Sequence, residues 1–190
     1  MPLTNPYPYV DTDVISARDY GLLTWNWAPH GATTNVTTRF STAGRVHGFR
    51  TPIPYPMSIT NIHLYIAGTP TSLSSTSCGV ALYGGTGALI GSLVGSSVST
   101  AWGTTGFKTH ALTGGPFQVP AGQVVVAAWW AGTTAPALLT NLIGTDINLG
   151  VGANVNLRQF LANTSTTTSA PANLSNFASS GAIPFWVGLS

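Results

Sequence analysis

The residues that normally cover the exposed face of a helix are almost absent from this chain of 190 residues. It contains no glutamate and one lysine, whereas it contains 27 threonines and 22 glycines. Glutamate and lysine are strong helix formers, and threonine and glycine are poor ones. This composition argues against a largely helical fold. Disorder is also disfavoured, because 44% of the residues are apolar and 10% are aromatic.

The scarcity of charge excludes several classes of partner. Charged residues make up 5% of the chain, against about 25% in an average soluble protein. Six scattered cations form neither the basic stripe that binds nucleic acid nor a polybasic membrane patch. The longest strongly apolar run, Val124 to Gly132, is too short for a bilayer, which a helix crosses in about 20 residues. The N-terminus lacks a cationic and an apolar region, so we expect no signal peptide.

Alternating residues predict β-strands from about residue 21 onwards. In residues 57–67, Ile62, Leu64 and Ile66 point to one side and polar neighbours to the other, which is typical of a half-buried strand. A glycine-rich turn at 84–87 predicts a hairpin. Further strands are predicted at 79–83, 88–94, 107–112, 119, 123–131, 137–143, 156–161 and 183–189. Short strands with regular turns predict an all-β fold, a sandwich or a barrel, over residues 21–190. Residues 162–180 are expected to form a surface loop.

Residues 1–20 differ from the rest of the chain. Three prolines lie among the first eight residues, and three of the four aspartates follow. Proline at this density favours an extended segment. A frayed terminus is the alternative, but tyrosines offer contact area at little entropic cost, so we favour an extended N-terminal arm that anchors the domain to a neighbouring protein. The predicted anchoring residues are Tyr7, Tyr9, Asp11 and Asp13.

The predicted strand at 123–131 is apolar on both faces. Alternation places Trp130 on one face and Trp129 on the other. One face can enter the core, and the second needs a loop, the arm or another subunit to cover it. We therefore predict Trp129 and Trp130 as subunit-interface residues of a homo-oligomer, with a trimer as the expected form. Coverage by the chain's own loops is the alternative.

One glycine-rich motif resembles a nucleotide-binding turn. Residues 83–91 read YGGTGALIG after an apolar run, as in the phosphate-binding turn of nucleotide-sugar epimerases. A dinucleotide site also needs a helix after the turn and an acidic residue about 20 positions later. The residues that follow are rich in glycine, serine and valine, and no carboxylate lies between Asp19 and Asp146. A hairpin turn explains the motif, and we expect no cofactor.

Catalytic and metal-binding residues are scarce. The four histidines show no short ligand spacing, and Asp11-Thr12-Asp13 lacks a surrounding glycine-shaped loop. Glycoside hydrolysis usually needs two positioned carboxylates, and there is no G-x-S-x-G nucleophile motif. We predict no catalytic residues, no metal site and no enzymatic activity. Surface binding remains, for which we select Trp102, in the turn-like stretch 100–103, and Tyr83 as ligand contacts. A core position is the alternative for each of these aromatic residues.

Several short stretches together resemble a known family. They are CGVALYGGTGALIGS at 78–92, AWGTTGFKTHAL at 101–112, PAG at 120–122, GTTAP at 132–136, YGLLTWN at 20–26 and PFWVGLS at 184–190. In this order they are similar to the signature of minor tail proteins of phages that infect actinobacteria, over residues 20–190. The chain departs from that family in two respects, because it has only a short arm before the domain and because Gly84-Gly85 replaces a common Asp/Asn-Ser pair.

The resemblance implies a single jelly-roll-like antiparallel β-sandwich on the surface of a phage particle. We therefore expect a non-enzymatic structural protein of the virion, attached through its arm to a tail protein or the major capsid protein. A minor tail component for host adhesion is the first reading, with a host cell-surface glycan as its ligand. A capsid decoration protein is the alternative. A carbohydrate-binding module is the rival from another class.

Overall fold

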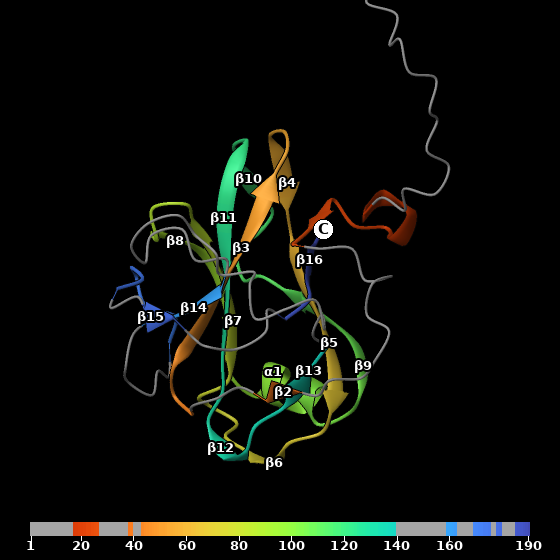
Figure 1. The fold of residues 1–190 in the computed structure, drawn as a ribbon, viewed down its shortest axis with the longest axis vertical. Coiled ribbons are helices and arrows are strands. Elements are labelled where there is room, and N and C mark those ends of the chain that lie inside the picture. The colour runs from red at the N-terminus through yellow and green to blue at the C-terminus, as the bar shows by residue number, and fades with distance from the viewer. Residues whose placement is uncertain are drawn as a thin grey trace, which may run out of the picture.

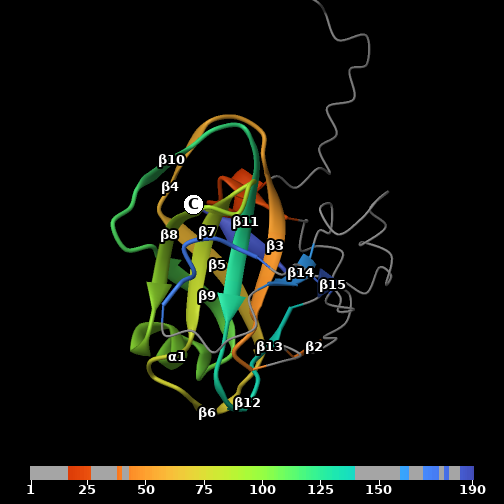
Figure 2. The same cartoon turned by 90° about the vertical axis from the view of Figure 1, so that its left-hand side faces the viewer.

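The strands form a sandwich of two antiparallel sheets, shown from two sides in Figures 1 and 2. The computed structural model describes residues 17–26, 38–39, 43–139, 159–162, 169–175, 178–179 and 185–190. The predicted all-β sandwich is confirmed, whereas the jelly-roll connectivity stays a prediction. Residues 1–16 of the predicted arm lie outside the described residues. Its last four residues, Ala17–Tyr20, form a short 3-10 helix (η1).

Within the described residues, each of the two sheets has six strands, and the one with the longer strands is here called the larger sheet. Its order is β15 (Ala178–Ser179), β14 (Gln159–Ala162), β3 (Val46–Ile53), β11 (Gly122–Trp129), β7 (Gly79–Gly84) and β8 (Leu89–Val94). The hairpin predicted around the turn at 84–87 is β7 and β8. β3 and β7 flank β11 along nearly its whole length, so β11 is the central strand.

The smaller sheet is built around β5 (Asn61–Gly68). β9 (Gly106–Ala111) pairs with one edge of β5, while β16 (Val187–Leu189) and β13 (Ala137–Leu138) share the other. β1 (Thr24–Trp25) extends the sheet beyond β16, and β2 (Thr38–Arg39) extends it beyond β13. Two short pairs complete the strands: β4 (Met57–Ile59) with β10 (Phe117–Val119), and β6 (Thr71–Leu73) with β12 (Gly132–Thr134).

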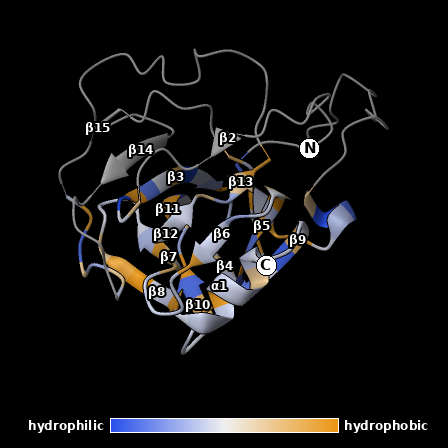
Figure 3. Cartoon of the chain, turned by 90° about the horizontal axis from the view of Figure 1, so that it is seen from below, coloured by the Kyte–Doolittle hydropathy of each residue, from blue (hydrophilic) through white to orange (hydrophobic). Residues whose placement is uncertain are grey.

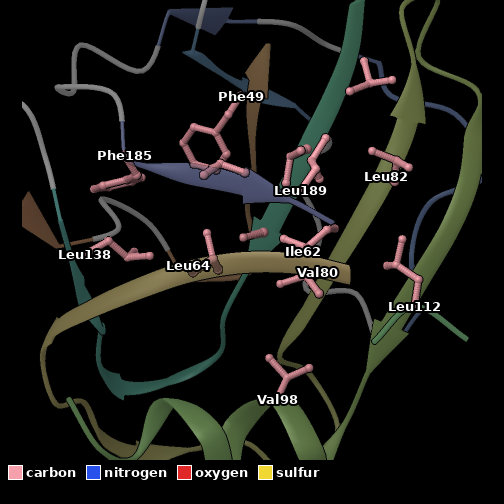
Figure 4. Close-up of a cluster of buried hydrophobic side chains, with 14 of the residues drawn as sticks. Phe49, Ile62, Leu64, Val80, Leu82, Val98, Leu112, Leu138, Phe185 and Leu189 are labelled. Atoms are coloured by element: carbon pink, nitrogen blue, oxygen red, sulfur yellow. The ribbon is translucent and has the colours of Figure 1, made fainter. Parts of the chain in front are cut away.

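The core lies between the two sheets (Figure 4). Alternation along β5 directs Ile62, Leu64 and Ile66 inward, and all three are fully buried. They pack with inward residues of the larger sheet such as Val80 and Leu82. Because water is excluded from this layer, each large aliphatic side chain contributes about 1.5–3 kcal/mol. The continuous strand predicted at 57–67 is interrupted at Thr60. Residues 57–59 form β4, which pairs with β10, and β5 begins at Asn61.

The second face of β11 is covered by the chain itself. Residues 170–174, here called the covering segment, cross the β7–β8 hairpin: the amide of Leu174 donates to Gly87, and Leu89 donates to Ala172, both at 2.9 Å. Leu174 and Ala170 pack on the outward residues of β11 and β7. Part of the loop expected at 162–180 thus covers the larger sheet, and Leu174 is buried against it.

Three sequence predictions are corrected by this packing. Trp129 and Tyr83 are fully buried, and Trp130 is 6% exposed. Trp129 and Tyr83 lie under the covering segment, where the Tyr83 hydroxyl donates to the carbonyl of Pro171 at 3.0 Å, and Trp130 faces the main core. Tyr83 is therefore not a surface ligand contact. Trp129 and Trp130 do not need a second subunit to cover them, so the trimer loses the argument on which it was predicted.

The prediction that Trp102 is a surface ligand contact is also wrong. Trp102 ends a helix, α1 (Ser96–Trp102), at the end of the sandwich where β6 and β12 lie (Figures 1 and 3). Val98 and Trp102, four residues apart, share the helix face that is buried. The Trp102 indole N–H donates to Nε2 of His110 at 3.1 Å, inside the core. Trp102 is fully buried and cannot be the predicted surface contact.

The close approach of β7 and β11 predicts a strong effect of one methyl group. A Cβ at Gly79 would lie 2.2 Å from Cζ2 of Trp129, and the indole is fixed in a packed core. We expect Gly79→Ala to lower the free energy of unfolding by about 1–3 kcal/mol through overpacking, measured by urea denaturation. Gly84→Ala on the same strand is the control, because its nearest neighbour would be 3.9 Å away. Equal stability of both variants would contradict this packing.

The buried Trp102–His110 pair predicts acid sensitivity. Burial, with smaller contributions from His63 and Lys108, lowers the pKa of His110 from 6.5 to about 4. Between these two values the unfolded chain binds more protons than the folded one, so stability falls as the pH is lowered from 6.5 towards 4, by about 3 kcal/mol in all. Urea midpoints across this range should show the loss.

His110→Gln separates this effect from other titrations. Its side-chain oxygen can still accept the Trp102 hydrogen bond, but it does not titrate. The acid-dependent loss should shrink more in this variant than in His63→Gln, which removes only the smaller contribution of His63. An unchanged pH profile in His110→Gln would show that another group is responsible.

Candidate ligand-binding surface

The outer face of the smaller sheet carries the candidate site. On β5 the residues that alternate with the core aliphatics are Asn61, His63 and Tyr65, all half-buried. The register of β9 places Thr109 opposite His63 and Phe107 opposite Tyr65. Polar and aromatic side chains therefore lie side by side on one sheet face. The sequence placed His63 on the polar side of its strand, and the structure agrees.

Phe107 is the most exposed large apolar residue among those described, with 60% of its surface accessible. Its ring centroid lies 5.3 Å from that of Tyr65 and 5.2 Å from that of Trp186, and both interplanar angles are 85°. Edge-to-face contacts of this kind are favourable. The exposed ring is thus held between two neighbours.

Gly188 has no side chain, and the side chains of Trp186 and Leu22 occupy the space that one would fill. A Cβ on this β16 residue would be 2.8 Å from Cδ1 of Leu22 and 3.0 Å from the Trp186 ring. Glycine thus allows both side chains to pack directly over the backbone of β16. Trp186 and Leu22 are both buried as a result.

The segment that contains η1 and β1 lies beside this face of the smaller sheet. Gly21 follows η1 with φ of +71°, a left-handed conformation that favours glycine, and the next residues return to the sheet, where Leu23 donates to Leu189 at 2.8 Å. The Tyr20 ring packs 5.7 Å from that of Trp25. The guanidinium of Arg18 stacks on Tyr55, 5.3 Å from its centroid, and donates to its hydroxyl, which ties η1 to the β3–β4 turn.

These elements enclose a cavity of about 300 Å³ on the side of the molecule where η1 and β9 lie (Figure 1). It is lined by residues 20–22, His63, Phe107, Thr109 and Trp186. None of these residues carries a carboxylate, an ammonium or a guanidinium group. The volume is at the lower end of the range for small-molecule pockets. Its aromatic walls and two polar side chains fit a small ligand with both apolar and hydroxyl groups.

His63 supplies a fixed polar group at the cavity. Its Nε2 lies 2.8 Å from Oγ of Ser190, which also accepts from Asn61 Nδ2 at 3.1 Å, and its Nδ1 lies 3.1 Å from Oγ1 of Thr109. Burial lowers the pKa of His63, so the ring is neutral at pH 7. In a serine–histidine catalytic pair a carboxylate at Nδ1 stabilises the imidazolium. Here a threonine hydroxyl occupies that position, so hydroxyl groups hold the His63 ring at both of its nitrogens.

The predicted site residues do not come together at this cavity. Tyr7, Tyr9, Asp11 and Asp13 lie outside the described residues, and Trp102, Tyr83, Trp129 and Trp130 are buried elsewhere. The residues that do meet come from four separate segments of the chain. Strand alternation identified the outward position of His63, but it could not show that Tyr20 and Trp186 lie beside it. The exposure of Phe107 could have been predicted in the same way, because strand alternation also gives it an outward position in the strand predicted at 107–112.

Within the described part of the chain, no three histidine, cysteine, aspartate or glutamate side chains are grouped so that they could hold a metal ion. None of the helices in these ranges has the length and apolar character needed to span a membrane.

Comparisons with known protein families, with characterised proteins and with solved structures find no match to this chain.

Proposed function

We propose that this chain is a non-enzymatic structural protein of a phage particle, whose sandwich presents a recognition site to the outside. The observation that carries the recognition role is the uncharged aromatic cavity between Phe107, Tyr20 and Trp186. An exposed ring held in place by its neighbours is typical of contact sites, because little side-chain entropy is lost on binding. The placement on a virion rests on the sequence resemblance to minor tail proteins, and host adhesion is the role we favour.

The composition supports a role in an assembly. Surfaces rich in threonine, serine and glycine lose less free energy on desolvation than charged surfaces do. Capsid decoration is the second candidate, since the same surface would suit packing on a shell. The number of copies in purified particles, measured by quantitative mass spectrometry, separates the two. A few copies favour the tail, and a number comparable to that of the major capsid protein favours the head.

The arm provides the direct test of virion attachment. Only residues 1–16 are removed in this test, because Arg18 of η1 contacts Tyr55 and Tyr20 of η1 lines the cavity. We expect deletion of residues 1–16 to leave a domain that unfolds within a few degrees of the full chain. We also expect this domain to be missing from purified particles when it replaces the full chain during infection, because the anchoring contacts are lost.

Full-length Leu89→Ala is the matched control, since it changes an exposed apolar residue on the larger sheet. It should be incorporated like the original chain. Normal incorporation of the deletion variant would refute anchoring by the arm. Absence of the full chain from purified particles would refute the virion role itself.

A further inference from the structure

We infer that the cavity lined by Tyr20, His63, Phe107 and Trp186 binds one pyranose unit of an uncharged glycan. This inference deepens the proposed recognition role and rests on it. The sequence resemblance leads only to the expectation of a host cell-surface glycan, and the inference adds where a sugar would bind and that it would be a neutral one.

Phe107 supplies the surface on which a sugar ring would pack. The C–H groups of a pyranose carry partial positive charge, and they are attracted to the negative face of an aromatic ring. At 60% exposure, Phe107 offers more free surface than any other large apolar residue among those described. Its contacts with Tyr65 and Trp186 keep the ring in place before the ligand arrives.

Thr109 supplies the polar contact beside that ring, and His63 orients its hydroxyl group. A sugar hydroxyl both donates and accepts, and so does the threonine hydroxyl. The exposed Thr109 and the half-buried His63 lie 3.1 Å apart across the β5–β9 pair. Ser190 holds the other ring nitrogen at 2.8 Å, which fixes the orientation of the imidazole. Apolar and polar contacts thus lie on adjacent sides of one small cavity.

The absence of charge in the lining selects for a neutral sugar. The nearest cation along β9, Lys108, donates to Oγ1 of Thr104 at 2.7 Å and to the carbonyl of Thr105 at 3.2 Å. Arg18 is engaged with Tyr55. A carboxylate, sulfate or phosphate on the ligand would lose its water without gaining an opposite charge, which is strongly unfavourable. Uronic acids, sialic acids and phosphosugars are therefore poor ligands for this site.

The test uses the full chain and simple probes. Methyl glycosides of glucose, galactose, mannose and N-acetylglucosamine are titrated and followed by protein NMR shifts. We expect at least one of them to bind with a dissociation constant of about 1 mM, as suits a ligand of this size. Glucuronic acid and N-acetylneuraminic acid should bind at least about tenfold more weakly.

Variants of Phe107 separate an aromatic contact from a merely apolar one. Phe107→Leu keeps an apolar side chain without a ring and should weaken binding about tenfold or more, whereas Phe107→Tyr should retain it. Leu89→Ala, on the larger sheet, should bind like the original chain. Unfolding curves confirm that each variant is folded, and since Phe107 is largely exposed we expect little change.

Three results would overturn the inference: no binding of any neutral pyranose, tighter binding of the acidic sugars, or undiminished binding by Phe107→Leu. Particle incorporation is measured separately, so the two proposals fail separately. A chain that is found in particles but binds no sugar refutes this inference alone. A chain that binds sugar and is absent from particles refutes the virion role and favours a carbohydrate-binding module.

Discussion

The burial of β11 on both faces is the constraint on which the rest of the fold depends. Val124, Val126 and Ala128 face the other sheet, while Val125, Ala127 and Trp129 face outward. An apolar outer face of this size would be unfavourable in water, at about 25 cal/mol for each Å² left exposed. The covering segment shields this face within one chain. It does so because residues much later in the sequence fold back over the β7–β8 hairpin. The close packing of Gly79 against Trp129 is part of the same solution.

Covering one sheet leaves the other available for recognition. β5 is buried on one face only, so its outward positions do not contribute to the core and can carry polar and aromatic side chains. The short segment of η1 and β1 lies beside that face without closing it, and the cavity remains between them. Because His63, Phe107 and Thr109 lie on the paired strands β5 and β9, these side chains are held more precisely than loop residues would be. In the proposed function, the larger sheet contributes mainly to stability and the smaller sheet carries the recognition site.

Much of the fold could be predicted from local patterns, but β3, which pairs with the central strand β11, could not. Alternation in 57–67 and the glycine turn at 84–87 identified β5 and the β7–β8 hairpin. β3 was missed because His47, Arg50 and Pro52 interrupt its apolar pattern, although the strand is mostly buried. α1 was missed because its serines are weak helix formers, and Trp102 looked exposed among small neighbours. The site escaped prediction because Tyr20, Phe107 and Trp186 meet only through sheet register, which local sequence does not specify.

The absence of charge in the cavity lining and the low charge content of the chain, 5%, have one consequence for how such a protein would bind. Without opposite charges, association gains no electrostatic steering and depends little on salt. A single small cavity then gives only weak binding, since a ligand of this size makes few contacts. Display of several copies on one particle would compensate, because each bound site raises the effective concentration of the ligand for the next. A weak neutral site is therefore suited to a protein displayed in several copies, because avidity then raises the overall affinity.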